Sequence, residues 1–189
     1  MNLAALEGGF TNAAVQSAQA FRAALEAMAR PGTLQPITGA APPAPMSPAA
    51  GALLLTLCDS TTPVHLAGAH DCAALRDWVT FHCGAPLVGA RDASFALGTW
   101  EALQPVDRFA IGLPDYPDRA ATLIVETTAL RQTGARLRGP GIQTTAALSL
   151  PESAAFQANH ALFPLGFDCF FACEGQIAAL PRSTIVEAA

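Results

Sequence analysis

The sequence contains no lysine, so all ten of its basic residues are arginines. A phosphate-binding loop of the Walker type uses a lysine to contact the β- and γ-phosphates of a nucleotide. Pyridoxal-phosphate enzymes use a lysine to hold their cofactor as a Schiff base. The missing lysine therefore excludes both enzyme classes in their standard form.

The chain also lacks long hydrophobic runs and clusters of positive charge. Hydrophobic residues make up 51% of its 189 residues, but no run approaches the roughly 20 residues that a membrane helix needs. Residues 1–10 include Glu7 and no basic residue, unlike a secretory signal. The net charge is −5, and nucleic-acid binding needs a concentrated positive surface. We therefore expect a cytoplasmic protein that binds neither membranes nor nucleic acids.

The cysteines and histidines do not form a recognisable site. An odd number of cysteines without an export signal predicts free thiols, here at Cys58, Cys72, Cys83, Cys169 and Cys173. His65, His70 and His82 lie near two of them in sequence, but no pair has the spacing of zinc ligands. The serines also lack a nucleophile–base context. The residues thus predict no metal site, no cofactor and no catalytic residue.

Hydrophobic periodicity and turn residues indicate an α/β fold. Helices are predicted over residues 12–30, over residues 48–57, in the segment that follows a cap at Asp71, and over residues 151–162. In the first helix, Thr11 or Asn12 is the cap, and one stripe is formed by Ala18, Phe21, Leu25 and Met28. Strands are predicted over residues 63–67, 94–97 and 121–130, the last one paired with residues 135–138 in a hairpin. A second hairpin is predicted for residues 167–173 and 176–180, around Glu174-Gly175. These elements predict one domain over residues 1–189 with a mixed sheet.

Four residues are candidates for contact with a ligand or a partner. Arg119 and Asp118 follow Tyr116, where a guanidinium could clamp a phosphate or phosphonate, or form a structural ion pair instead. Arg138 precedes Gly139-Pro140-Gly141, a turn that could present amides to an anion or simply end a strand. Arg182 follows Pro181 at a strand end, where it could contact a subunit or a ligand.

Several segments resemble, in order, the PhnH family, the H subunit of the bacterial carbon–phosphorus lyase system. The resemblance runs from Phe21-Arg22 and Arg30-Pro31-Gly32 to the C-terminal segment. Its blocks include Leu54-Leu55-Thr56-Leu57-Cys58-Asp59, Tyr116-Pro117-Asp118-Arg119, Leu137-Arg138-Gly139-Pro140-Gly141, Phe163-Pro164-Leu165-Gly166-Phe167-Asp168 and Leu180-Pro181-Arg182-Ser183-Thr184. Nearly the whole chain is covered.

The resemblance implies a three-layer α/β/α fold similar to that of pyridoxal-phosphate transferases, here without the cofactor lysine. It also implies a subunit of a complex in which the G, H, I and L subunits join methylphosphonate to the ribose of ATP. Alpha-D-ribose 1-methylphosphonate 5-triphosphate is formed and adenine is lost. The implied role is structural, with the G, I and J subunits as partners and a homodimer when isolated. The alternative is an independent phosphonate- or phosphate-binding protein or enzyme that uses arginine clamps, favoured by a pocket where Arg119, Arg138 and Arg182 converge.

Overall fold

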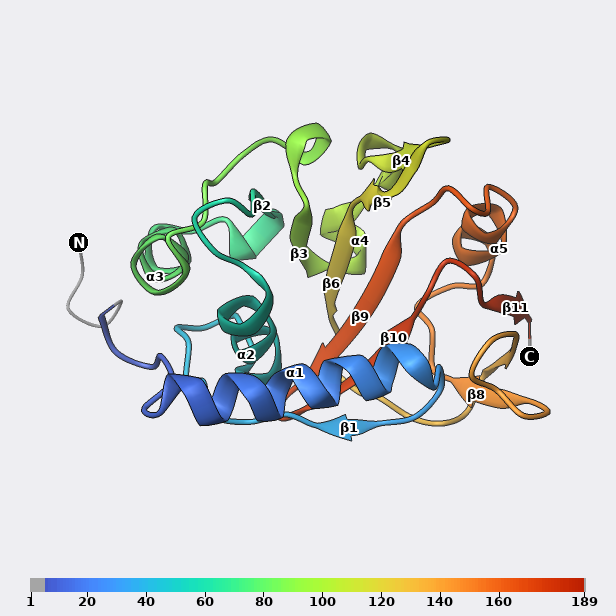
Figure 1. The fold of residues 1–189 in the computed structure, drawn as a ribbon, viewed down its shortest axis with the longest axis horizontal. Helices are drawn as coiled ribbons and strands as arrows, with labels where there is room; N and C mark the ends of the chain where they lie inside the picture. The colour runs from blue at the N-terminus through green and yellow to red at the C-terminus, as the bar shows by residue number, and fades with distance from the viewer. Residues whose placement is uncertain (1–5, 189) are drawn as a thin grey trace.

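The computed structural model describes residues 6–188, and its centre is a six-stranded mixed sheet (Figure 1). The strand order is β1-β10-β9-β6-β3-β2. The bounds are Gln35–Pro36 for β1, Val64–Leu66 for β2, Phe95–Thr99 for β3, Thr122–Glu126 for β6, Asp168–Cys173 for β9 and Gln176–Leu180 for β10. The strands β2, β3, β6 and β9 are parallel, and β10 runs antiparallel to β9.

Two hydrophobic clusters pack on opposite faces of this sheet. Successive residues of a strand point to opposite faces, so in β6 Ile124 joins one cluster while Leu123 and Val125 join the other. The first cluster includes residues of the helices α1 (Ala13–Ala29), α2 (Pro48–Leu57) and α3 (Ala73–Cys83). The second includes residues of α4 (Trp100–Leu103), of α5 (Ala154–His160) and of a small three-stranded sheet. The strands of this small sheet are β11 (Ile185–Glu187), β7 (Ala135–Arg138) and β8 (Ala146–Leu148), in that order.

The α/β fold class with a mixed sheet is therefore confirmed. The layer on the side of the second cluster differs from the implied helical layer, because it combines helices with the strands β7 (Ala135–Arg138), β8 (Ala146–Leu148) and β11 (Ile185–Glu187). A separate two-stranded ribbon consists of β4 (Ile111–Leu113) and β5 (Tyr116–Ala120). No helix in the part of the chain that the structure describes is long and apolar enough to cross a membrane.

The helix predictions for residues 12–30 and 48–57 are confirmed. Asn12 caps α1 by accepting a hydrogen bond from the amide of Val15, and Ser47 caps α2 in the same way through Ala50. The cap of α3 is Cys72 rather than the predicted Asp71, which instead forms an ion pair with Arg76. The helix predicted over residues 151–162 is shorter, because α5 covers only Ala154–His160.

The C-terminal hairpin is confirmed, whereas the hairpin predicted for residues 121–130 and 135–138 is wrong. β9 and β10 pair in register from Cys169 and Leu180 to Cys173 and Gln176. By contrast, β6 pairs with β3 and β9 in the large sheet, and β7 pairs with β8 and β11 in the small one. The uninterrupted apolar run of β6 is typical of a central parallel strand that is covered on both faces.

Candidate functional site

The carboxyl ends of the four parallel strands meet at one edge of the large sheet. β2 is followed by the short 3-10 turn Gly68–His70, β3 ends at Thr99, β6 ends at Glu126, and Glu174 follows β9. In α/β sheets, ligands bind in crevices outside the carboxyl ends of parallel strands. A ligand-binding site is therefore expected at this edge of the sheet.

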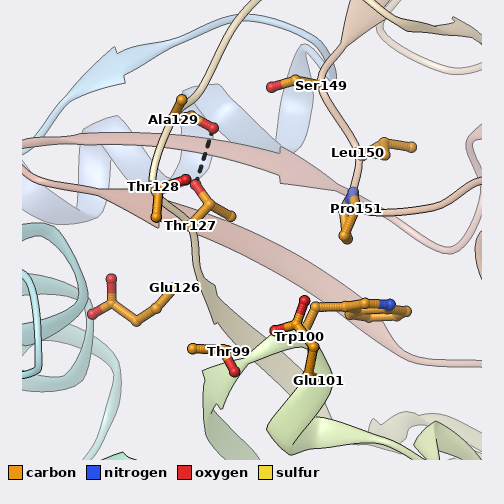
Figure 2. A pocket seen from close by; sticks show the side chains of 10 residues that line it. All are labelled: Thr99, Trp100, Glu101, Glu126, Thr127, Thr128, Ala129, Ser149, Leu150 and Pro151. Atoms are coloured by element: carbon orange, nitrogen blue, oxygen red, sulfur yellow. Dashed lines mark hydrogen bonds between the residues drawn. The ribbon is translucent and has the colours of Figure 1, made fainter.

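Two adjoining hollows open at this edge. The Trp100 pocket has a volume of about 330 Å³ and is also lined by Glu101, Ser149 and Pro151 (Figure 2). The His70 pocket has a volume of about 510 Å³ and is also lined by Pro45, Cys173 and Glu174. The two hollows share Thr99, Glu126, Thr127 and Thr128. Volumes of this size suit small ligands.

Glu126 is the nearly buried carboxylate between the two hollows. Its side chain is 10% exposed, and its Oε1 accepts a hydrogen bond of 2.7 Å from the amide of Ser47. Figure 2 shows the Glu126 carboxylate directed away from Trp100 and Pro151. Burial raises the pKa of Glu126, and the charge of Glu174 raises it further, while the Ser47 hydrogen bonds lower it.

The N-terminus of α2 faces the same edge, and the chain's own groups occupy its first amides. The amide of Ser47 donates to Glu126, that of Ala49 donates to the carbonyl of Glu174 at 2.8 Å, and that of Ala50 donates to the Ser47 hydroxyl at 3.1 Å. A helix N-terminus with free amides would attract a phosphate group. Here the Glu126 carboxylate accepts the hydrogen bond from the Ser47 amide in the position that a phosphate would occupy.

His70 is buried beside this carboxylate. It is 2% exposed, and its Nε2 lies 4.0 Å from Oε1 of Glu126. Neither ring nitrogen has a hydrogen-bond partner of normal geometry. Burial lowers the pKa of His70, and a hydrogen bond with the backbone of Pro45 acts in the opposite direction. The ring therefore favours the neutral state, with one donor and one acceptor nitrogen.

The charge of the two hollows does not suit an anionic ligand. The lining residues that the structure describes include Glu101, Glu126 and Glu174 but no arginine. Phosphates and phosphonates are recognised by arginines, lysines, free amides or cations. The lining residues thus give the edge a preference for hydrogen-bond donors and positive charge.

Arg182 is engaged within the chain. Its Nη2 and Nε donate to the two carboxylate oxygens of Asp168 at 2.6 and 3.1 Å, and its Nη1 donates to the carbonyl of Pro117 at 2.7 Å. The amide of Arg182 also donates to Asp168, at 2.8 Å. The guanidinium thus ties the end of the C-terminal hairpin to β5.

The other three predicted residues lie on or near small surface strands. Arg119 stacks on the ring of Tyr116 with its Cζ 4.3 Å from the ring centroid, and Asp118 beside it is exposed. The Nε of Arg138 in β7 lies 3.6 Å from the Oε1 of Glu187 in β11. None of the three arginines lines either pocket at the sheet edge. A ligand role for Arg119, Arg138, Arg182 and Asp118 stays a prediction.

The turn Gly139-Pro140-Gly141 packs closely against the end of α1. Gly139 and Gly141 have positive φ angles of 129° and 79°, and a Cβ at Gly141 would overlap the carbonyl oxygen of Ala29. Glycine is required there for backbone conformation and close approach, which supports the strand-exit interpretation.

The five cysteines are free, as predicted. Burial raises the pKa of Cys83 to about 12 and also raises those of Cys58 and Cys169. These three thiols therefore stay protonated and behave as small hydrophobic groups. Within residues 6–188, no group of three or more histidine, cysteine or acidic side chains is placed to hold a metal ion.

Glu126 was not among the residues singled out from the sequence, and His70 was considered there only as a zinc ligand. The available signal for Glu126 was a carboxylate directly after the apolar run Leu123–Ile124–Val125. For His70 the signal was weaker, because a single histidine after a short strand has no motif spacing. The two residues are 56 positions apart in the sequence, and only the parallel pairing of β2, β3 and β6 brings them together.

Comparison with known proteins identifies one family over nearly the whole chain. The family model described as "Bacterial phosphonate metabolism protein (PhnH)" matches residues 8–187. A relative from Rhizobium meliloti (strain 1021) is described as alpha-D-ribose 1-methylphosphonate 5-triphosphate synthase subunit PhnH. It is 38% identical over 192 residues, which cover 95% of this chain and 94% of the relative.

Proposed function

This chain belongs to the PhnH family of bacterial phosphonate metabolism proteins, and we propose that it is a subunit of an alpha-D-ribose 1-methylphosphonate 5-triphosphate synthase. The observation that carries the proposal is the 38% identity to a curated subunit of that synthase, over almost the full length of both chains. Nearly every part of the relative therefore aligns with a part of this chain. The family resemblance found in the sequence is thereby confirmed.

We propose further that the subunit supports assembly rather than chemistry. The synthase would join methylphosphonate to the ribose of ATP with the help of the G, I and L subunits, and all of these substrates are anions. The pockets at the sheet edge present glutamates, and Glu126 already occupies the N-terminus of α2. The Arg182 guanidinium is committed to Asp168 and Pro117. These contacts support a structural role and disfavour arginine clamps on a phosphonate.

The partner surface would include the outer face of α1. Phe21 and Leu25 are 52% and 58% exposed there, although both are large and apolar. They border a groove of about 600 Å³ whose other lining residues are mostly apolar, among them Met28, Leu57, Phe95 and Phe170. Obligate interfaces between subunits are large and hydrophobic. We therefore assign this groove, called the α1 groove below, to contact with another subunit of the synthase.

The remaining features of the proposal follow from family membership. The partners would be the G, I and J subunits, and the isolated protein would form a homodimer in the cytoplasm. The chain would form a single PhnH-like domain over residues 1–189. Its large sheet would be similar to that of pyridoxal-phosphate transferases, without the cofactor lysine.

Co-purification tests the subunit proposal. The tagged chain is co-expressed with the G, I and J subunits, and the purified material is sized by light scattering. A complex of defined stoichiometry is expected. A Leu25→Arg variant should lose partners, because a charge would be buried in the apolar α1 groove. The matched control is Leu113→Arg, which changes an equally exposed leucine in the β4–β5 ribbon.

Two results would count against the proposal. A chain that never associates with these subunits would remove the subunit role. Equal loss of partners in the Leu25→Arg and Leu113→Arg variants would remove the assignment of the α1 groove, while leaving the subunit role intact.

A further inference from the structure

The apolar stripe of α1 lies on the surface with the spacing of a coiled-coil seam. Its residues are separated by four, three, four and three positions: Ala14, Ala18, Phe21, Leu25 and Met28. The first four are exposed and Met28 is half-buried, whereas the buried residues of α1 are all alanines. Apolar residues that repeat every 3.5 positions form a straight seam that packs against a second helix. The stripe therefore has the pattern of one half of a helix pair.

Two hollows open along this seam, and Phe21 lines both of them. On the side of the C-terminus of α1 lies the α1 groove, which Leu25 and Met28 also line. On the side of its N-terminus lies a hollow of about 560 Å³, which Ala14 and Ala18 also line. Phe21 is thus a large exposed side chain between two mostly apolar hollows, the arrangement in which the side chains of two helices interdigitate.

The α1 groove offers few hydrogen bonds to an occupant. Its polar lining residues are Asp168 and Ser183. Both carboxylate oxygens of Asp168 already accept hydrogen bonds from Arg182. A polar occupant would lose its bonds to water without replacement, whereas an aromatic or aliphatic side chain would lose none. The groove therefore selects a large apolar side chain.

A second copy of the chain supplies such a side chain when two α1 helices pack antiparallel. In a two-fold interface, every contact between two positions occurs twice, once in each direction. With the axis beside Ala24, Phe21 of one copy lies level with Ala27 of the other. That level is between Leu25 and Met28, the seam residues that line the α1 groove. Each Phe21 then enters the groove of the other copy.

The charged residues of α1 fit the same register. Arg22 is exposed and forms no ion pair with any residue that the structure describes. With the axis beside Ala24, Arg22 of one copy lies level with Glu26 of the other. The Glu26 side chain is 39% exposed, although it also pairs with Arg30 at 2.8 Å. A parallel pairing would instead set each charge against its own kind, so the apolar and the charged residues both favour the antiparallel pair.

We propose that a second copy of this chain occupies the α1 groove, through an antiparallel pair of α1 helices in which each Phe21 enters the groove of the other copy. The inference rests on the proposed function, because it names the subunit that the groove contacts. The pair of chains, rather than the single chain, is then the unit that the G, I and J subunits bind.

Light scattering of the isolated chain tests the pairing without any other subunit. The natural chain should be a dimer at about 10 micromolar, and Phe21→Glu should raise the dissociation constant of that dimer at least about a hundredfold, because a charge would enter each apolar groove. The matched control is Phe81→Glu, which changes a phenylalanine of α3 that is 51% exposed, against 52% for Phe21. Thermal unfolding of the same samples shows that each variant is folded.

Exchange of the two charges tests the register. At low salt, Arg22→Glu and Glu26→Arg should each weaken the dimer by about threefold or more, because like charges would then lie level with each other. The variant that carries both changes should regain most of the natural affinity. A double variant no tighter than the single ones would overturn the antiparallel register.

The remaining outcomes separate this inference from the subunit role. A dimer that Phe21→Glu leaves intact, or that Phe81→Glu weakens equally, would overturn the pairing. A chain that stays monomeric alone and still binds the G, I and J subunits would refute the second copy and keep the subunit role. A dimer that Phe21→Glu separates, in a chain that never binds those subunits, would sustain the pairing and refute the subunit role.

Discussion

The Arg182 guanidinium joins three separate parts of the chain. It contacts both carboxylate oxygens of Asp168 at the start of β9 and the carbonyl of Pro117 in β5, and its own backbone follows β10. The side chains of Arg182 and Asp168 are only 12% and 24% exposed. A bidentate, shielded pair of this kind is worth more than a surface ion pair.

Loss of this guanidinium should destabilise the fold. Arg182→Ala leaves the Asp168 carboxylate without its ionic partner, so the free energy of unfolding should fall by about 2–4 kcal/mol. Arg138→Ala is the matched control, because Arg138 is half-exposed and lies 3.6 Å from Glu187; its cost should be below about 1 kcal/mol. Urea unfolding of the three proteins measures both values. Similar losses for the two variants would show that the Arg182 contacts are not structurally important.

The raised pKa of Glu126 makes stability depend on pH in a defined direction. The folded chain holds this proton more tightly than the unfolded chain, whose ordinary value is 4.5. The favourable contribution is therefore fully present below that value and is lost as the pH rises through the folded pKa. The pKa of His70 is lowered from its ordinary value of 6.5, and this has the opposite effect. The folded chain disfavours the protonated ring, so the free energy of unfolding falls as the pH drops below that value.

Glu126→Gln should therefore become more stable relative to the natural chain as the pH rises from about 4 to about 7. The measurement is urea unfolding of both proteins at several pH values. Repeating the comparison in a His70→Asn background removes the titration of the histidine. A difference in stability that does not change with pH would mean that burial does not raise the pKa of this carboxyl.

At the scale of elements, α1 packs through its small residues and exposes its large ones. Ala20, Ala24 and Ala27 are buried in the core, whereas Phe21 and Leu25 are exposed. Small side chains let the helix approach α2 and β10 closely. Figure 1 shows α1 running past α2 and crossing β10. The exposed stripe is then free for another protein.

Substitutions on the two faces of α1 should affect different properties of the chain, stability on one face and assembly on the other. Ala24→Leu adds atoms to a packed core and should lower the free energy of unfolding by about 1–3 kcal/mol. Leu25→Arg changes an exposed position and should alter it by less than about 0.5 kcal/mol, while disrupting assembly with the other subunits. Thermal unfolding and co-purification, measured on the same preparations, separate the two effects. A Leu25→Arg chain that unfolds like Ala24→Leu would place Leu25 in the core.

Local sequence patterns predicted the helices and strands of this fold better than they predicted which strands pair with one another. Capping residues and turns located α1, α2 and the β9–β10 hairpin, because those signals act between neighbouring residues. The partner of β6 depends instead on residues far away in the chain, so the local turn at residues 132–134 suggested the wrong pairing. Likewise, periodicity identified the apolar stripe of α1 but could not show that an alanine face packs inward.

At the scale of the whole molecule, the contacts agree with a protein that completes a complex. Its sheet edge holds glutamates where a nucleotide-binding protein would present free amides or basic groups. Its apolar α1 groove is open on the surface. The site at the sheet edge could not be predicted from the sequence, since His70 and Glu126 meet only through the order of the parallel strands.

We infer that the synthase needs this chain for assembly rather than for chemistry. The most direct measurement is phosphorus NMR of product formation from ATP and methylphosphonate by the reconstituted G, I and L subunits, with and without this chain. We expect no product without the chain. With an Arg119→Gln, Arg138→Gln double variant we expect a rate within about twofold of normal, because these exposed side chains do not contact substrate in the proposed role. Full activity without the chain would show that the synthase does not need it. Loss of activity in a double variant that still assembles would show that these arginines take part in the chemistry.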